Sequence, residues 1–208
     1  DQCRWLGGAG SRWGIDSNED GILDRWKILS PEEATAEIVT ALANRDQSQF
    51  QRLLPSEAEL TEVGFSQELL DRVRTQVKVA KERFGKLSQE QKEVTPQTQW
   101  TAMLAGLPGV LPKSPEGEVD DVVGYDNVVA LTEEVNAGGG QVFVGSLVRF
   151  GNVWRPLDLP KLPSGSETMA ESFSLFSPEV DGVAFQTGNV TSETLQPFLE
   201  QLRAIEQK

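Results

Sequence analysis

The hydrophobic residues of this chain change their spacing near Thr95, and this change restricts the fold more than any other feature. After Thr95 they alternate with polar residues and β-branched residues become frequent, which is typical of strands. Between residues 67 and 87 they recur every three or four positions, the period of an amphipathic helix whose stripe faces a core. That stripe consists of Leu70, Val73, Val77, Ala80, Phe84 and Leu87. Helices followed by an antiparallel meander predict an α+β domain.

Capping signals predict where the earlier helices begin. Ser30 and Glu33 form a capping box, with a proline between them at the first helical position. Asp46 predicts a second helix start and Pro55 its end, and Ser56 predicts a third, short turn. The core face of the first helix is expected to hold Ala34, Ile38, Ala41 and Leu42.

The second half of the chain predicts a meander of strands at 97–104, 119–135, 141–150 and 153–155. A proline-containing loop at 106–115 is expected between the first two strands, and a glycine-rich turn at 136–140 before the third. Gly151 and Asn152 predict a two-residue hairpin turn between the last two strands. Four residues of the third strand are expected to point one way: Val142, Val144, Val148 and Phe150.

The segment DSNEDGILDRWK, from Asp16 to Lys27, has the oxygen spacing of a calcium loop. Calcium takes six to eight oxygen ligands, and a glycine at loop position 6 allows the sharp turn that wraps the ion. Gly21 stands at that position. The predicted calcium ligands are the side chains of Asp16, Asn18, Asp20 and Asp24 at positions 1, 3, 5 and 9, and the carbonyl of Ile22 at position 7.

The loop departs from the EF-hand pattern at position 12, where Lys27 stands in place of a bidentate glutamate. Loss of that carboxylate is expected to weaken binding unless another carboxylate or water completes the shell. The alternative interpretation is a turn rich in Asp and Asn that its own side chains cap. The sequence leaves both interpretations open.

Composition excludes several classes of function. The formal charge of −13 argues against nucleic acid as a partner, because phosphate binding needs a basic face. No apolar run is long enough for a membrane span, and the first residues lack the pattern of a signal peptide. Because the chain starts at Asp1 without methionine, we expect a fragment or a processed chain.

The chain contains no histidine, which removes the commonest general base and most zinc sites. The adjacent carboxylates at 120–121 and 133–134 fall on strands, where neighbouring side chains point to opposite faces. Cys3 is the only cysteine, so it is either a buried thiol or paired outside this segment. We therefore predict that the chain is not an enzyme.

Four regions are expected along the chain: a calcium-loop module at 1–29, an α+β domain at 30–160, a loop or linker at 161–190 and a C-terminal helix at 191–208. Residues 1–6 partly repeat residues 24–29, which suggests tandem loops packed by Trp5, Trp13 and Trp26. The C-terminal helix would either dock on the domain or lead into the next one. Its apolar residues are Leu195, Phe198, Leu199, Leu202 and Ile205.

The segment CRW…GGAGSRWGIDSNEDGILDRWKILSPEEA resembles large bacterial envelope proteins in which acidic loops of the thrombospondin type 3 or EF-hand kind recur ahead of an α+β domain. A thioredoxin-like redoxin domain often follows in that group. The resemblance is strong for residues 1–34 and looser for 119–160. It implies an exported accessory region, periplasmic or in the cell envelope, that binds calcium and contacts another domain of its parent chain. It transfers no catalytic residue, because the redoxin Cys-x-x-Cys motif is not in this chain.

The order of elements and the closing segment FVGSLVRFGNVWRPLDLP resemble the nuclear transport factor 2 superfamily. This resemblance implies helices packed on a curved, cone-like antiparallel sheet. If so, the mouth of the cone would be lined by Trp100, Tyr125, Arg149 and Trp154, unless these side chains simply fill the core. The predicted function is a calcium-binding spacer or interaction region, and the alternative is a module that binds a small molecule or peptide in the cone.

Overall fold

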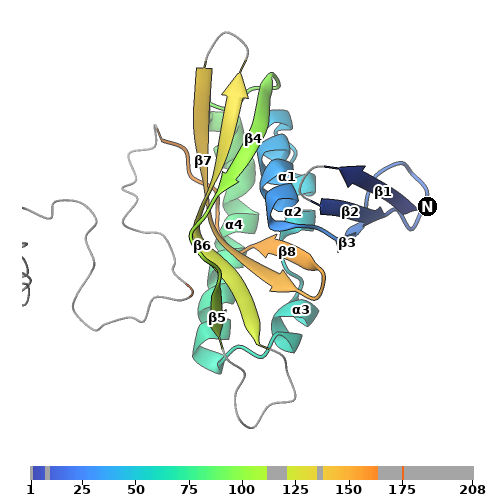
Figure 1. Ribbon diagram of the computed structural model, residues 1–208, viewed down its shortest axis with the longest axis vertical. Coiled ribbons are helices and arrows are strands. Elements are labelled where there is room, and N and C mark those ends of the chain that lie inside the picture. Colours follow the sequence, from blue (N-terminus) through green and yellow to red (C-terminus); the bar gives the residue numbers. More distant parts are fainter. Residues whose placement is uncertain (1, 8–9, 112–120, 135–137, 164–174, 176–208) are drawn as a thin grey trace, which may run out of the picture. The chain divides into compact units, whose positions relative to one another are not determined.

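Helices fill the first half of the main domain and strands the second, as the change of spacing near Thr95 predicts (Figure 1). The computed structural model describes residues 2–7, 10–111, 121–134, 138–163 and 175, with side chains from Arg12 onward. Its helices are α1 (Pro31–Asn44), α2 (Gln47–Leu53), α3 (Glu57–Glu62) and α4 (Gln67–Glu90).

Helices α1, α2 and α3 each start at the side chain that the sequence predicts as the cap. The Oγ atom of Ser30 accepts the N–H of Glu33 at 3.2 Å, and the Glu33 carboxylate accepts the N–H of Ser30 at 3.0 Å. Asp46 caps α2, and Ser56 forms a second capping box for α3. These caps satisfy N–H groups that the first helical turn leaves without partners.

The predicted apolar stripes form the core. The four expected residues of α1 have no exposed surface, and Phe84 of α4 stacks on Phe50 of α2 with ring centres 4.0 Å apart. Leu70, Val73 and Ala80 are also buried. Because α4 contributes to both core clusters, it packs along most of the sheet.

The main sheet is antiparallel and runs in the order β4-β6-β7-β8. The short strand β5 also pairs with β6, at residues that β4 does not reach. Its strands are β4 (Thr98–Leu104), β5 (Gly109–Leu111), β6 (Val122–Glu134), β7 (Gly138–Phe150) and β8 (Val153–Pro156). Two predictions are wrong here. A strand lies inside the expected 106–115 loop, and Gly138 to Gly140 belong to a strand because they pair with β6.

Two irregularities bend the sheet where β6 and β7 pair. Tyr125 lies opposite Leu147 while Val128 lies opposite Gly145, so β6 holds one extra residue there, and β7 holds one extra residue at the next step. Asn127 and Gly145 take positive φ values of 55° and 86° at these positions. Such bulges increase twist and bend strands. The result is the α+β architecture with a curved antiparallel sheet that we predicted.

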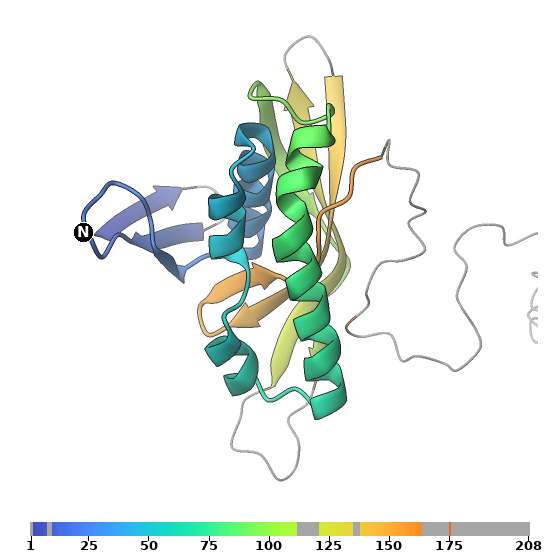
Figure 2. The same ribbon diagram turned by 180° about the vertical axis from the view of Figure 1, so that it is seen from behind.

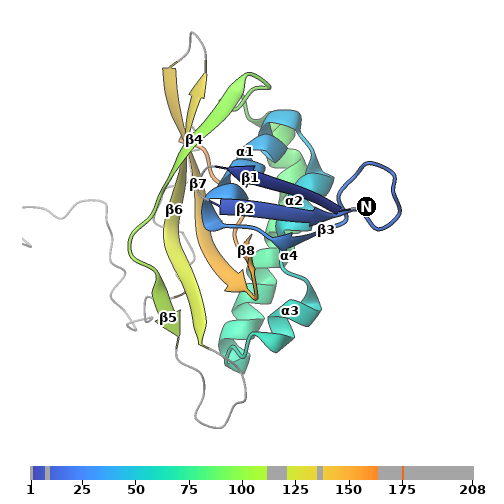
Figure 3. The same cartoon turned by 45° about the vertical axis from the view of Figure 1, so that its right-hand side comes forward.

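Helices α1 and α4 lie on one face of this curved sheet. Figures 1 and 2 show the arrangement from opposite sides, and in Figure 3 the sheet and the helices stand side by side. Trp100 of β4 fixes α1 in this place, because its indole N–H donates to Thr35 Oγ1 at 2.9 Å.

A second, three-stranded antiparallel sheet precedes α1, in the order β1 (Gln2–Gly7), β2 (Gly10–Ile15) and β3 (Arg25–Ile28). The two segments of the partial repeat thus both form strands, on either side of β2. After β3, Leu29 accepts the N–H of Trp154 at 3.0 Å and donates to Asn152 O at 3.1 Å. Trp26 is buried in the main core. All described residues belong to one unit.

The predicted linker and C-terminal helix lie outside the described residues, except for 161–163 and 175. Lys161 pairs with Phe143 of β7, and Leu175 is buried against the second core cluster. The side chains of Cys3 and Trp5 and the whole of Asp120 also lie outside the described part. No described helix is both long enough and apolar enough to cross a membrane.

Candidate functional site

The predicted calcium loop connects two antiparallel strands, β2 and β3. The N–H of Asp24 donates to the carbonyl of Ile15 at 2.8 Å, which closes the loop at its base. Residues 16 to 24 therefore leave and re-enter the same sheet. The loop is held at both ends, because the strands before and after it pair with each other.

Asp16 organises the interior of this loop. Its side chain is only 5% exposed. Its Oδ1 accepts the N–H of Glu19 at 2.7 Å, and its Oδ2 accepts the N–H of Gly21 at 2.9 Å. Glu19 and Gly21 both have positive φ, of 61° and 83°, so the backbone curls around the carboxylate. Glycine takes this conformation without the steric cost of a side chain.

The other predicted ligands are exposed and bind neighbouring groups of the loop. Asn18 Oδ1 accepts the N–H of Asp20 at 3.3 Å, and Asp20 Oδ1 accepts the N–H of Ile22 at 2.8 Å. Asp24 Oδ2 accepts the N–H of Ser17 at 2.6 Å. These are the bonds that the alternative interpretation, a turn capped by its own side chains, requires.

The oxygen atoms of the predicted ligands are of the kind that calcium binds, but in this structure they accept hydrogen bonds from backbone N–H groups of the loop. The predicted ligands include three carboxylates and one amide oxygen within one short loop, and hard cations prefer such oxygen ligands. Within the described residues, however, no three acidic, histidine or cysteine side chains are grouped so as to hold a metal ion. Binding therefore requires the exposed carboxylates of Asp20 and Asp24 to turn toward Asp16.

Lys27, the residue at loop position 12, contacts an aromatic ring. Its Nζ lies 3.7 Å from the centre of the Trp13 ring, a cation–π geometry. Lys27 and Trp13 stand on the adjacent strands β3 and β2, which brings the two side chains together. The ammonium group thus has a binding partner of its own outside the set of loop oxygens.

The four residues predicted to line the cone divide into two groups. Tyr125 and Trp154 contact each other, with ring centres 5.1 Å apart, and pack with Trp100 against the main core cluster. Arg149 is exposed and lines a groove instead. The structure therefore packs the three aromatic residues against the core, while Arg149, which lies directly opposite Trp154 in the pairing of β7 with β8, reaches the surface.

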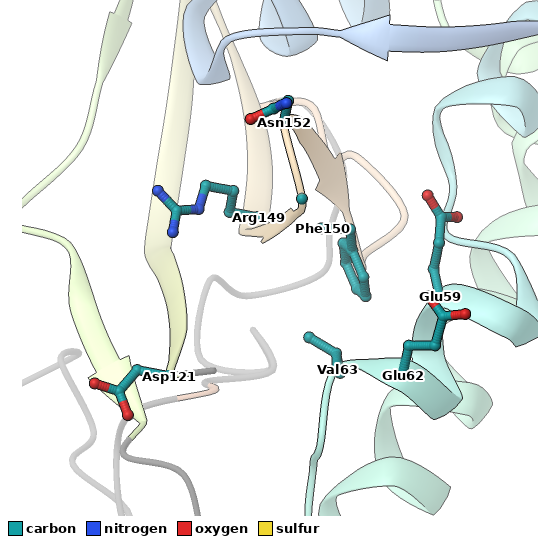
Figure 4. Close-up of a pocket in the computed structure, with 8 residues that line it drawn as sticks. Glu59, Glu62, Val63, Asp121, Arg149, Phe150 and Asn152 are labelled. Atoms are coloured by element: carbon teal, nitrogen blue, oxygen red, sulfur yellow. The ribbon is translucent and has the colours of Figure 1, made fainter. Parts of the chain in front are cut away.

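This groove has a volume of about 500 Å³ and lies between α3 and the hairpin that joins β7 to β8 (Figure 4). Phe150 and Val63 stand in its middle, with Glu59 and Glu62 on one side and Arg149 on the other. Glu59 is not available to a ligand, because its Oε1 accepts from Arg155 at 2.8 Å.

A buried polar cluster at the sheet bulge was not predicted from the sequence. The Oδ2 atom of Asp158 accepts the N–H of Ser146 at 2.7 Å, and Asp126 Oδ1 accepts the Ser146 hydroxyl at 2.9 Å and the Leu175 N–H at 3.1 Å. Burial raises the pKa of Asp158 from 3.8 to about 6, although its hydrogen bonds from Ser146 lower it. Gly145, just before Ser146, was the signal in the sequence that could have predicted this bulge, because a glycine inside a strand often marks one.

A comparison with protein-family models, curated proteins and solved structures finds no match to this chain.

Proposed function

We propose that this chain is a non-enzymatic, calcium-binding accessory region of an exported multidomain protein, acting as a spacer or interaction region. The observation that carries the proposal is the buried carboxylate of Asp16, around which the loop backbone curls through Glu19 and Gly21. The loop thereby joins a fixed carboxylate to exposed oxygen donors at the spacing that calcium loops use.

The ion would be held by Asp16, Asn18, Asp20, Asp24 and the carbonyl of Ile22. Calcium supplies positive charge that offsets the repulsion among the three carboxylates. Asp20 and Asp24 are exposed, so turning them inward costs little packing energy. Water would complete the shell that a glutamate at position 12 completes in an EF-hand.

The loop is coupled to the main domain through both of its strands. Arg12 of β2 forms an ion pair with Glu37 of α1, which also accepts from Gln49 of α2 at 2.8 Å. Trp26 of β3 is buried in the main core. Because a ligand that binds only the folded state stabilises it, calcium is expected to raise the stability of the whole unit.

Isothermal titration calorimetry tests this proposal. Wild-type protein is expected to bind calcium, and Asp16→Asn to lose most of that binding. Glu19→Gln is the matched control, because it removes the same charge from a loop position that is not a ligand position. An absence of calcium binding to the wild type at millimolar concentration would refute the proposal.

The proposed export rests on the resemblance of residues 1–34 to bacterial envelope proteins. It is tested by fractionating cells that produce the full parent protein and probing each fraction with an antibody against this region. Recovery with the periplasm or envelope is expected, and recovery with the cytoplasm alone would contradict it.

A second candidate function is the binding of a small molecule or peptide, and the groove at Arg149 favours it. Arg149 forms no ion pair within the described residues, and the groove beside it is lined in part by the apolar side chains of Val63 and Phe150, the latter 7% exposed. A ligand with a carboxylate next to an apolar group would suit both. Amide NMR spectra recorded with a panel of aromatic carboxylic acids are expected to shift at residues 149 to 152, and Arg149→Gln should abolish the shifts.

A further inference from the structure

Among the described residues, one edge of the main sheet has no paired strand beside three consecutive glycines. Strand β7 pairs with β6 from Gly138 to Val148, but its neighbours on the other side reach only part of it. Residues of β8 pair with Leu147 to Phe150, and Lys161 pairs with Phe143. In the described part of the chain, no segment pairs with this edge of β7 from Gly138 to Val142.

The direction of the free backbone groups follows from Phe143. Its N–H and C=O bond to Lys161 at 2.9 and 2.8 Å, so they point away from β6. The register with β6 is regular from Phe143 back to Gly138, and backbone direction alternates along a strand. The N–H and C=O of Gln141 and Gly139 therefore point to the open edge, where an added strand would bond to them.

A cavity of about 230 Å³ adjoins this edge and carries negative charge. Glu93 and Glu134 stand at it, with Thr132 and Val94 forming an uncharged part of the wall. Gly140 leaves the space open, because a Cβ atom there would lie 2.8 Å from Thr132 Oγ1. Glycines in strands often mark a close approach by another backbone.

We propose that this edge of β7 binds an extended segment of another polypeptide as an added strand, with a lysine or arginine side chain in the cavity beside Glu93 and Glu134. Main-chain bonds to Gly139 and Gln141 supply affinity, and the cavity supplies the preference for a basic side chain. The net charge of −13 favours a basic segment over an acidic one at long range.

The test uses the full chain and two short fluorescent peptides of alternating threonine and valine that differ in one central residue, lysine or glutamate. Fluorescence anisotropy is expected to show tighter binding of the lysine peptide. The same peptide N-methylated at alternate residues, which removes the N–H groups of one edge, is expected to lose roughly tenfold in affinity or more.

Two variants at one position separate backbone bonding from packing. Gly139→Pro removes an N–H that points to the open edge and none that bonds to β6, and is expected to abolish binding. Gly139→Ala keeps that N–H, and its Cβ atom would meet only Thr132 O at an ordinary 3.7 Å, so it should bind as the wild type does. Circular dichroism confirms that both variants fold.

The charge component is tested by Glu93→Gln combined with Glu134→Gln, which should remove the preference for lysine and leave main-chain bonding intact. Failure of the full chain to bind either peptide at millimolar concentration would overturn the proposal, as would equal binding by Gly139→Pro and Gly139→Ala. Self-association of the chain that Gly139→Pro abolishes would assign the edge to a second copy and equally overturn it.

Discussion

The ammonium group of Lys27 lies 3.7 Å from the centre of the Trp13 ring, on the neighbouring strand. Lys27 occupies the position at which an EF-hand loop would supply its bidentate glutamate. Because Trp13 binds the lysine side chain, the ligands proposed for calcium do not have to accommodate a positive charge among them.

Replacing Lys27 with alanine therefore tests whether this lysine contributes to stability through Trp13 or opposes calcium binding through its charge. The loss of the cation–π contact is expected to lower the free energy of unfolding by about 0.5–1 kcal/mol, because the lysine is exposed. Calcium affinity should change by less than about tenfold, since only a screened charge is removed. Urea unfolding and calorimetric titration measure the two effects, and a large gain in affinity would show that Lys27 opposes the ion directly.

Arg155 is expected to be the most important charged residue for stability. Its side chain is 8% exposed, its Nε and Nη2 donate to Glu59, and its Nη1 donates to the carbonyls of Arg52 and Leu53 at the end of α2. Arg155→Met would leave a carboxylate and helix-end carbonyls without these donors, at a cost of about 3 kcal/mol or more. Arg149→Met, at an exposed position two residues before the hairpin turn, should cost less than about 0.5 kcal/mol.

Urea unfolding of both arginine variants at neutral pH checks this expectation. Equal effects of the two substitutions would mean that the buried ion pair does not hold α2 and α3 to the sheet.

Asp158 is expected to make stability fall as pH rises. Its folded pKa of about 6 exceeds the usual 3.8, so between these values the folded state binds more protons than the unfolded state. Stability from this group is therefore complete below pH 3.8 and decreases until about pH 6. Asp126 adds to the raised pKa and Lys161 opposes it.

Asp158→Asn should remove this decrease, because asparagine does not titrate and its side-chain oxygen still accepts the N–H of Ser146. Free energies of unfolding from urea titrations at several pH values between 4 and 7 give the comparison. Parallel curves for wild type and variant would contradict the assignment.

Gly145 is expected to be irreplaceable for two separate reasons. Its φ is +86°, and a Cβ atom there would collide with the side chain of Asp158. Gly145→Ala should cost about 2–5 kcal/mol, the sum of a left-handed backbone penalty and overpacking. Gly151→Ala, at φ +58° with nothing within 4 Å, isolates the backbone penalty and should cost about 1–2 kcal/mol. A similar loss in both variants, measured by thermal unfolding, would show that Asp158 moves aside.

Local signals account for what the sequence predicted correctly. The caps at Ser30, Asp46 and Ser56 and the apolar stripe of α4 each depend on residues a few positions apart, so propensity and pattern locate them. The hairpin at 151–152 is equally local, because two residues set its geometry.

Features that depend on distant residues were missed. The bulge at Gly145 depends on how β7 meets β6 and on Asp158, which arrives from beyond β8. The strand at Gly138 to Gly140 forms against propensity, because pairing with β6 outweighs the conformational cost of glycine. Trp26 was expected to pack tandem loops, yet it lies in the main core. The reason is that Leu29, just after β3, is hydrogen-bonded to Trp154 of β8, which holds β3 against the main domain.

Calcium binding by the loop can be followed through thermal unfolding monitored by tryptophan fluorescence, first in calcium and then in chelator, because Trp13 and Trp26 flank the loop. We expect a higher melting temperature in calcium for the wild type and for Glu19→Gln, and no shift for Asp16→Asn. An identical melting temperature in calcium and chelator for the wild type would contradict this expectation, and would leave the segment from Asp16 to Asp24 as a turn closed by its own side chains.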